Sequence, residues 1–204
     1  MRLLFATGNR AKVRHYGERL AERGIEIVTL SDLGIQCDVD ESGKDPVENA
    51  VIKAEAYHKA SGLPTIAMDD GLYLDAVPEK LQPGTHVRRV GERELTDAEM
   101  IEHYLDLVNR FGTNGFLQGY FLKGVAVSTE ERTYSYGMKS YRCFCNRQSE
   151  KRETGYPLAS IQMVEPFHKF KSELTKEEEA IAMEAEFRDI FTFVEETIRK
   201  IEEK

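Results

Sequence analysis

Hydrophobic residues alternate with polar ones or form short runs in some segments, and recur at helical spacing in others. This difference separates the expected strands from the expected helices. Apolar runs or alternating positions predict strands over residues 2–6, 25–30, 65–69, 71–76, 116–128, 132–144 and 159–164. Apolar residues at helical spacing predict helices over residues 10–23, 45–61, 96–111 and from 175 toward the C-terminus. Strands that alternate with helices, followed by a long hairpin, indicate an α/β fold with a mixed sheet.

Each of the three later helices opens with a capping motif. The motifs are Asp45-Pro46-Val47-Glu48, Thr96-Asp97-Ala98-Glu99 and Thr175-Lys176-Glu177-Glu178. In such motifs the first side chain accepts hydrogen bonds from the free N–H groups of the new helix. Residues 78–91 hold two Pro and two Gly and are expected to form a loop, as is the charged stretch 147–154.

Length and charge narrow the class of protein. The chain has 204 residues, a length that predicts one domain or one domain with a lobe over residues 1–204, and its formal net charge is −8. The acidic excess argues against broad electrostatic binding to nucleic acid or anionic membranes. No apolar run reaches the ~18 residues of a membrane span, and the chain enters its first strand without a secretory h-region. We therefore expect a cytoplasmic protein without nucleic-acid or membrane partners.

The cysteine content is also typical of a protein in the reducing cytoplasm. There are three, Cys37, Cys143 and Cys145, an odd number without a disulfide framework. Cys143 and Cys145 alternate on an expected strand, so both sulfurs lie on one face. A metal pair is one interpretation, and structural thiols are the one that we favour, because no other Cys or His spacing supports a metal.

The first candidate for chemistry is the segment Thr7-Gly8-Asn9-Arg10-Ala11-Lys12, which follows the first strand and opens the first helix. Gly8 would let the backbone turn sharply, and Thr7 and Asn9 offer short polar side chains. The N–H groups at a helix N-terminus favour an anion, and Lys12 adds a positive charge one turn later. An equally simple interpretation is a helix capped by Asn9, with Lys12 in solvent.

Three groups of carboxylates could complement a phosphate. They are Asp38 with Asp40 and Glu41, then Glu48, and finally Asp69-Asp70 with Asp75 close behind. Side chains at the carboxyl end of a strand often face a ligand crevice in α/β folds, and carboxylates beside phosphate oxygens suit Mg²⁺. A carboxylate there can also accept a proton from an attacking water. Alternatively, Asp69-Asp70-Gly71 is only a turn, and for Glu48 we favour a capping role.

Basic residues could complete such a site. Lys53 follows Asn49 by one helical turn, and Arg88-Arg89 lies in the Gly/Pro loop. Each alone is typical of a solvated side chain. Together, Lys12, Lys53 and Arg89 near carboxylates and a metal would form a cradle for a triphosphate.

These motifs resemble, in order and spacing over residues 1–90, the inosine triphosphate pyrophosphatase (Ham1-like) family of enzymes that hydrolyse non-standard purine nucleotides. The matching segments are Ala6-Thr7-Gly8-Asn9-Arg10-Ala11-Lys12, Asp40-Glu41-Ser42-Gly43, Glu48-Asn49-Ala50-Val51-Ile52-Lys53-Ala54, Gly62-Leu63-Pro64, Ala67-Met68-Asp69-Asp70-Gly71-Leu72-Tyr73-Leu74-Asp75-Ala76, and Pro83-Gly84 with Arg89. Residues 91–145 fit the family only in pattern.

The resemblance implies an elongated mixed sheet with flanking helices, a cleft between two lobes, and a homodimer. It also implies Mg²⁺-dependent cleavage of a nucleoside triphosphate into the monophosphate and pyrophosphate. Carried over residue by residue, the substrate-binding residues would be Thr7, Gly8, Asn9, Lys12, Lys53, Asp70 and Arg89. Asp40, Glu41 and Asp69 would bind metal, and Asp69 would also activate the water.

The second half departs from the family pattern. The base-recognising Phe-Gly-Tyr/Trp-Asp-Pro run is reduced to Thr154-Gly155-Tyr156-Pro157, Glu179 stands at the family lysine, and Met183-Glu184-Ala185 replaces Ser-His-Arg. Met68 and Asp70 replace the usual Asp and Ser around Asp69. Because these losses remove donors that would recognise a 6-keto purine, the base preference is expected to have diverged.

The sequence therefore leaves three functions open. The first is a nucleoside triphosphate pyrophosphatase with a diverged base site. The second is a non-catalytic nucleotide-binding or scaffold protein that retains the fold. The third, less supported, is a phosphatase-like hydrolase that acts on another phosphorylated metabolite.

Overall fold

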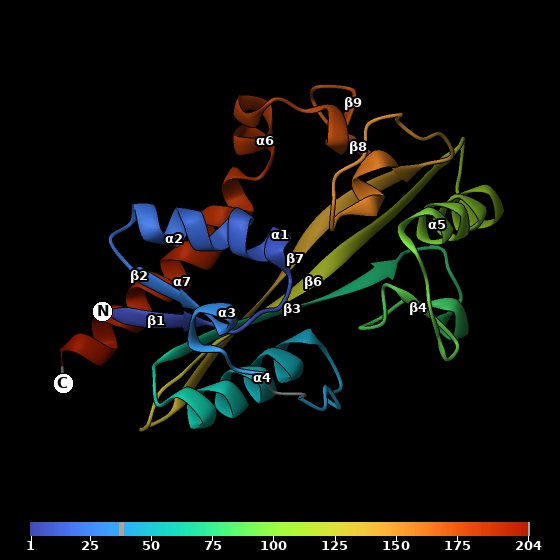
Figure 1. Cartoon of the computed structure of the whole chain (residues 1–204). Coiled ribbons are helices and arrows are strands. Elements are labelled where there is room, and N and C mark those ends of the chain that lie inside the picture. Colours follow the sequence, from blue (N-terminus) through green and yellow to red (C-terminus); the bar gives the residue numbers. More distant parts are fainter. Residues whose placement is uncertain (37–38, 204) are drawn as a thin grey trace. The chain divides into compact units, whose positions relative to one another are not determined.

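The computed structural model describes residues 1–36 and 39–203 (Figure 1). Cys37 and Asp38 lie outside the described residues, so the predictions that involve them stay predictions. The predicted mixed α/β fold is confirmed, since one sheet contains seven strands in the order β2-β1-β3-β6-β7-β8-β9. Their bounds are β1 Arg2–Phe5, β2 Glu26–Thr29, β3 Thr65–Leu74, β6 Phe116–Ser128, β7 Thr133–Cys145, β8 Gln162–Val164 and β9 Lys169–Phe170. Strand β1 is parallel to β2 and β3, whereas β7, β8 and β9 are antiparallel.

The four predicted helical regions are helical, and α3 is a further helix that the periodicity did not predict. They are α1 Arg10–Lys12, α2 Glu18–Glu22, α3 Leu30–Leu33, α4 Pro46–Ser61, α5 Asp97–Phe111, α6 Lys176–Ala182 and α7 Glu184–Glu202, with a π-helical turn η1 at Val13–Gly17 between α1 and α2. Short 3-10 turns are η2 Glu79–Leu81, η3 Pro157–Ser160 and η4 Lys171–Glu173, and a separate strand pair is formed by β4 Arg89–Val90 and β5 Arg93–Glu94.

The chain divides into two compact units. Unit 1 contains Met1–Asp70, Lys123–Met138 and Phe187–Lys204, and unit 2 contains Gly71–Leu122 and Lys139–Glu186. The prediction of a single domain with two lobes over residues 1–204 stays a prediction.

Unit 1 has a helical layer on each face of β1 and β3, with α4 on one face and α2 and α7 on the other (Figure 1). On the α4 face the buried residues are mostly small, and the cluster includes Ala6, Ala50, Ala54, Ala67 and Ala126. Small side chains let the helix approach the sheet closely. A Cβ atom at Gly124 of β6 would lie 2.2 Å from the carbonyl oxygen of Pro46, so glycine is required where the first turn of α4 meets that strand. Tight packing thus fixes the height of α4 above β3.

Unit 2 is built around α5. Its buried face, which includes Tyr104 and Leu107, packs with Leu72 and Leu74 of β3 and with Phe144 of β7. The helix starts at the predicted capping box of Thr96 and Glu99. The arrangement buries the part of β3 that follows the acidic pair.

Three predicted elements were wrong in detail. Strand β3 runs without a break from Thr65 to Leu74, so neither the predicted interruption nor the alternative turn at Asp69-Asp70-Gly71 occurs. The single predicted C-terminal helix is two helices, because Met183 leaves the helical conformation and buries its side chain. The region 159–164 begins as the 3-10 turn η3 and becomes a strand only at Gln162.

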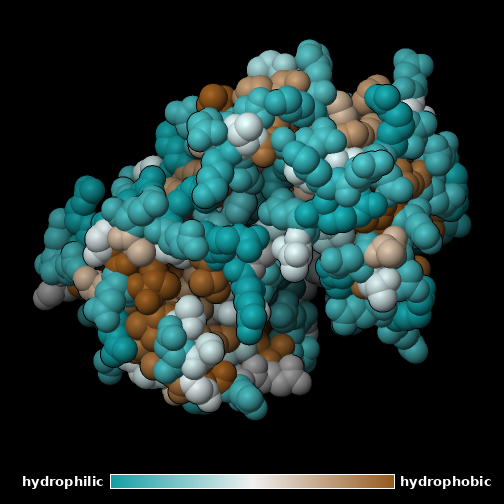
Figure 2. Space-filling model, turned by 45° about the horizontal axis from the view of Figure 1, so that its top comes forward, coloured by the Kyte–Doolittle hydropathy of each residue, from teal (hydrophilic) through white to brown (hydrophobic). Residues whose placement is uncertain are grey.

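The surface agrees with the composition. Most of the face in Figure 2 is hydrophilic, and hydrophobic residues gather in one larger patch at its lower left. Among the described residues, the exposed large hydrophobic side chains are Val90, Phe116, Tyr141 and Ile181. None of the helices in residues 1–36 and 39–203 combines the length and apolar character needed to cross a membrane.

The two described cysteines are free thiols, as predicted, with Cys145 buried and Cys143 half-buried. Burial raises the pKa of the Cys143 thiol. Within the described part of the chain, no group of three or more His, Cys, Asp and Glu side chains is placed to hold a metal ion. These observations favour structural thiols over a metal pair.

Candidate functional site

The candidate site lies in unit 1 where β1 ends. Strand β1 has β2 on one side and β3 on the other, both parallel to it, so the chain passes from β1 to β2 and then crosses back over β1 to β3, and the strand order reverses there. Ligands of open α/β sheets bind at the carboxyl ends of strands at such a switch point. The segment from Thr7 to Lys12 follows β1 at this end, and Met68, Asp69 and Asp70 lie on β3 beyond its pairing with β1.

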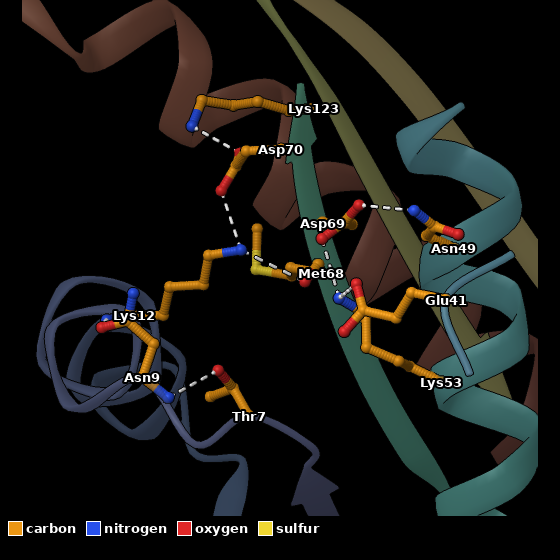
Figure 3. Close-up of polar contacts among 10 residues, drawn as sticks. All are labelled: Thr7, Asn9, Lys12, Glu41, Asn49, Lys53, Met68, Asp69, Asp70 and Lys123. Atoms are coloured by element: carbon orange, nitrogen blue, oxygen red, sulfur yellow. Dashed lines mark hydrogen bonds and ion pairs between the residues drawn. The ribbon is translucent and has the colours of Figure 1, made fainter. Parts of the chain in front are cut away.

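A lysine continues the backbone ladder between β1 and β3. The N–H groups of Leu4 and Ala6 donate to the carbonyl oxygens of Pro64 and Ile66, at 2.9 and 2.8 Å. At the next equivalent carbonyl, that of Met68, the donor is Nζ of Lys12 at 3.2 Å (Figure 3). The ammonium group of Lys12 is therefore held against the middle of β3, at the peptide unit that joins Met68 to Asp69.

The loop before Lys12 forms a compact turn. Asn9 donates its N–H to Oγ1 of Thr7 at 3.1 Å, and Oδ1 of Asn9 accepts from the N–H of Lys12 at 3.3 Å. Asn9 therefore caps the helix, as the simpler interpretation predicted, but Lys12 is not in solvent, since its side chain is 13% exposed. A Cβ at Gly8 would meet nothing within 4 Å, and its φ lies outside the left-handed region, so neither a close approach nor a positive φ requires glycine in this turn.

Helix α4 holds Asp69. Asn49 and Lys53 stand one turn apart on α4, and they donate to Oδ2 and Oδ1 of Asp69 at 3.1 and 2.8 Å (Figure 3). Lys53 also donates to Oε2 of Glu41 at 3.0 Å. The loop that carries Glu41 is anchored on the same helix, because Oδ1 of Asn49 accepts from the N–H of Gly43 at 2.8 Å. Two carboxylates from distant segments thus meet around one ammonium group.

The charge state of Lys53 follows from these contacts. Burial alone would lower the pKa of Lys53, but the charges of Asp69 and Glu41 and their hydrogen bonds raise it above its ordinary value. Lys53 is therefore a permanent cation at neutral pH. A position that stabilises a cation between two carboxylates has hard oxygen donors of the kind that Mg²⁺ prefers.

Asp70 faces the other side of β3 from Asp69, as consecutive residues of a strand do. Its Oδ2 lies 2.8 Å from Nζ of Lys12, and its Oδ1 lies 3.0 Å from Nζ of Lys123 on β6 (Figure 3). Burial alone would raise the pKa of Asp70, but the charges of the two lysines and their hydrogen bonds hold it well below its ordinary range. Asp70 is therefore ionised at neutral pH.

Sequence reasoning missed Lys123. A signal was present, because this lysine interrupts the otherwise apolar stretch Phe121-Leu122-Lys123-Gly124-Val125 in an expected strand. A charged residue in such a stretch is almost always paired when buried. The network in Figure 3 contains three lysines and three carboxylates, so its formal charges balance.

Other predicted residues lie outside this network. Asp40 is exposed, next to Glu41 in the loop. Arg89 is exposed on β4 of unit 2, while its neighbour Arg88 pairs with Asp97 at 2.7 Å. Asp45 caps α4 with its side chain, whereas Glu48 accepts from the N–H of Lys44 at 2.8 Å, one residue before the N–H that a capping box uses.

The segment that departs from the family pattern lies in unit 2. Glu179 pairs with Lys171 at 3.7 Å, so its negative charge has a local counter-ion. Met183 is buried, and Glu184, which begins α7, is exposed. Glu186 is buried and accepts hydrogen bonds from Ser140 and Arg142. The side chains near this helix junction therefore carry their own internal pairings.

Known proteins match the chain over its first two thirds. A family model described as the Ham1 family matches residues 3–136. A dITP/XTP pyrophosphatase of Shigella flexneri is 36% identical over 105 residues, 52% of this chain and 52% of that protein. The chain thus matches about half the length of the curated relatives.

Solved structures match over nearly the whole chain. A HAM1 protein from Coxiella burnetii has a TM-score of 0.76 at 24% identity and covers 96% of this chain and 99% of that one. A nucleoside-triphosphatase / dITP/XTP pyrophosphatase from Mycobacterium abscessus has a TM-score of 0.70 at 25% identity and covers 94% and 98%. The likeness of fold therefore extends beyond the region in which the sequences align.

Proposed function

Since this chain belongs to the Ham1 family, we propose that it is a hydrolase that cleaves nucleoside triphosphates into the monophosphate and pyrophosphate, with Mg²⁺ as cofactor. One observation carries the proposal. Lys12 and Lys53 bring positive charge to the middle of β3 from two different helices, beside the buried carboxylate of Asp69. This is the combination that a polyanionic substrate and a water-activating base require.

The residues that follow β1 bind the phosphate chain in this proposal. Thr7, Gly8 and Asn9 form the turn, and the open space around Gly8 admits phosphate oxygens close to the backbone. An ammonium group has three N–H donors, and Asp70 and Met68 use two of those of Lys12. The third remains for a phosphate oxygen. Lys53, which donates to Asp69 and Glu41, contributes its remaining donor in the same way.

Asp69 and Glu41 fit a divalent cation, because their oxygens already flank the cationic Nζ of Lys53 at 2.8 and 3.0 Å. Two carboxylates suffice for Mg²⁺, which completes its shell with phosphate oxygens and water. We propose that Asp40, adjacent to Glu41, assists. When bound, the metal neutralises the charge that develops on the phosphate groups.

Asp69 accepts the proton of the attacking water in this mechanism. Its carboxylate is 12% exposed and is fixed by Asn49 on one oxygen and by Lys53 on the other. A candidate general base is recognised first by its geometry, and this carboxylate is held in a fixed orientation. Asn49 and Lys53 of helix α4 therefore hold the general base Asp69 in place.

We propose that the part of the site that recognises the nucleobase has diverged from the family pattern. Glu179 and Met183 stand where the family pattern has a lysine and a serine, and the aspartate of the aromatic run is missing. The substrates named for the relatives, dITP and XTP, are therefore a starting point for this chain and not its expected optimum. Arg89 remains a proposed substrate-binding residue, Asp70 is proposed to contribute to substrate binding through Lys12, and a cytoplasmic homodimer remains the expected state.

A non-catalytic nucleotide-binding role is the second candidate. The balanced charges of the six-residue network favour it, because each carboxylate already has a lysine partner. Under this alternative, nucleotides bind and are not hydrolysed.

The experiment that separates these functions measures products. The purified protein is incubated with purine and pyrimidine nucleoside triphosphates, including ITP and XTP, with Mg²⁺ or with EDTA. Pyrophosphate and orthophosphate are measured separately. Mg²⁺-dependent pyrophosphate release supports the proposal, and orthophosphate release alone indicates a phosphatase-like hydrolase. Nucleotide binding without any hydrolysis by folded protein supports the non-catalytic role.

A further inference from the structure

Lys123 is the first residue of the β6 segment that belongs to unit 1, and the proposed reaction gives it no role. It comes from β6 and reaches Asp70 with Nζ at 3.0 Å from Oδ1. Its side chain is only 11% exposed, and Nζ lies 5.9 Å from the centre of the Tyr16 ring. A buried lysine is expensive to desolvate, so its pairing calls for a physical explanation.

Charge balance supplies one. Lys12 and Asp70 are 2.8 Å apart, so as an isolated pair they would be formally neutral. A neutral pair attracts a phosphate chain weakly. Lys123 contributes a second positive charge to the same carboxylate, so Asp70 is shared between two ammonium groups. The positive charge of Lys12 is then available to an anion instead of being cancelled by its neighbour.

Geometry supports the same conclusion. Asp70 uses separate oxygens, with Oδ1 toward Lys123 and Oδ2 toward Lys12 (Figure 3). A carboxylate held on one oxygen cannot turn away, so the other oxygen stays directed at Lys12. Together with the carbonyl of Met68, Asp70 then fixes two of the three donors of Lys12.

We propose that Lys123 is a positioning residue for phosphate binding, which acts on Lys12 through Asp70. The inference rests on the proposed function, because it assigns the lysine to the phosphate end of that same site. Lys123 does not touch the substrate. It serves as the counter-ion of Asp70, so that Lys12 can serve as the counter-ion of the polyphosphate.

The test begins with Lys123→Met, which keeps the length of the side chain and removes its charge. We expect the KM for the best triphosphate substrate to rise about tenfold, with kcat within about twofold of the wild type. Lys123→Arg should restore most of the loss, because it returns the charge. Lys59→Met is the control, since Lys59 is exposed on the last turn of α4, and its kinetics should match the wild type.

The decisive variant removes both charges. In Lys123→Met/Asp70→Asn, no carboxylate remains to cancel Lys12, so the KM should be lower than that of Lys123→Met alone. Recovery by a second substitution supports the proposal, and additive losses overturn it. An unchanged KM in Lys123→Met, or a lower melting temperature with normal KM, would show a structural role only and also overturn it.

Binding of inorganic pyrophosphate, measured by calorimetry, gives a second readout that needs no turnover. The same order is expected, with the wild type tightest, the double variant next and Lys123→Met weakest. If Lys123→Met does not fold, Lys123→Gln replaces it. Failure of the wild type to hydrolyse any triphosphate refutes the proposed function, whereas equal pyrophosphate binding by the wild type and the charge-removed variant refutes the role of Lys123.

Discussion

Replacing Asp69 with asparagine separates the chemistry of the site from its stability. The Asp69 and Lys53 side chains are 12% and 13% exposed, and their charged atoms are 2.8 Å apart. Removing one partner of a buried ion pair typically costs about 3–5 kcal/mol. The cost here is smaller, because Glu41 stays 3.0 Å from Lys53 and the new amide still offers one acceptor oxygen. We expect a loss of about 1–2 kcal/mol, which lowers the melting temperature of a chain of this size by about 2–8 °C.

The effect on turnover should be far larger. A general base contributes about 10²–10⁴-fold to a rate, so Asp69→Asn should lower kcat by about a thousandfold. Steady-state release of pyrophosphate measures this, and thermal unfolding of the same samples measures the stability. The variant should therefore be folded at the assay temperature and nearly inactive.

The matched control is Asp75→Asn. Asp75 is an exposed carboxylate one residue beyond the end of β3, and its loss should change neither kcat nor the melting temperature. The assignment of Asp69 as the base is refuted if Asp69→Asn keeps more than about a tenth of the wild-type kcat.

Three further expectations follow from the same network. Lys12→Ala should raise the KM for the triphosphate by about ten- to a hundredfold with little change in kcat, because it removes a charge that binds the ground state and transition state alike; a fall in kcat at unchanged KM would contradict this. Because the folded pKa of Asp70 lies well below its ordinary value of 3.8, its contribution to the unfolding free energy is complete at neutral pH and is lost as the pH falls toward the folded pKa. Urea unfolding from about pH 7 to pH 3 should therefore show a gap between wild type and Asp70→Asn that shrinks below about pH 4, and a gap that widens in acid would be the wrong sign. Chelation of divalent ions with EDTA should abolish pyrophosphate release and added Mg²⁺ should restore it, whereas chelator-resistant turnover would exclude the proposed cofactor.

Much of the fold could be predicted because hydrophobic periodicity and capping motifs are local signals. Residues 96–111 carry both, and the structure has a helix at Asp97–Phe111. Helix α3 was missed although Thr29 and Asp32 form a capping box and Gly34 ends the helix in the left-handed region. The error at Asp69-Asp70-Gly71 has a different cause. Asp-Gly favours a turn locally, but pairing within the sheet and packing against α5 extend the strand to Leu74.

The residues of the candidate site could be predicted only where they lie in or next to a helix or strand that the sequence itself predicts. Lys12 lies in the first turn of α1, Lys53 lies about two turns into α4 and Asp69 follows an apolar run, and the structure brings all three together at the middle of β3. Pairing partners cannot be read from local sequence. That Asp70 faces Lys123, 53 residues away along the chain, depends on which strand becomes the neighbour of β3.

The opposed directions of Asp69 and Asp70 have a consequence for how such a site can change over time. The strand backbone separates two sets of charges, one shared with α4 and the other with α1 and β6. A substitution in one set leaves the partners of the other in contact. Substitutions can therefore change the affinity for the anion and the reactivity of the general base independently, although Asp69 and Asp70 are adjacent in the sequence.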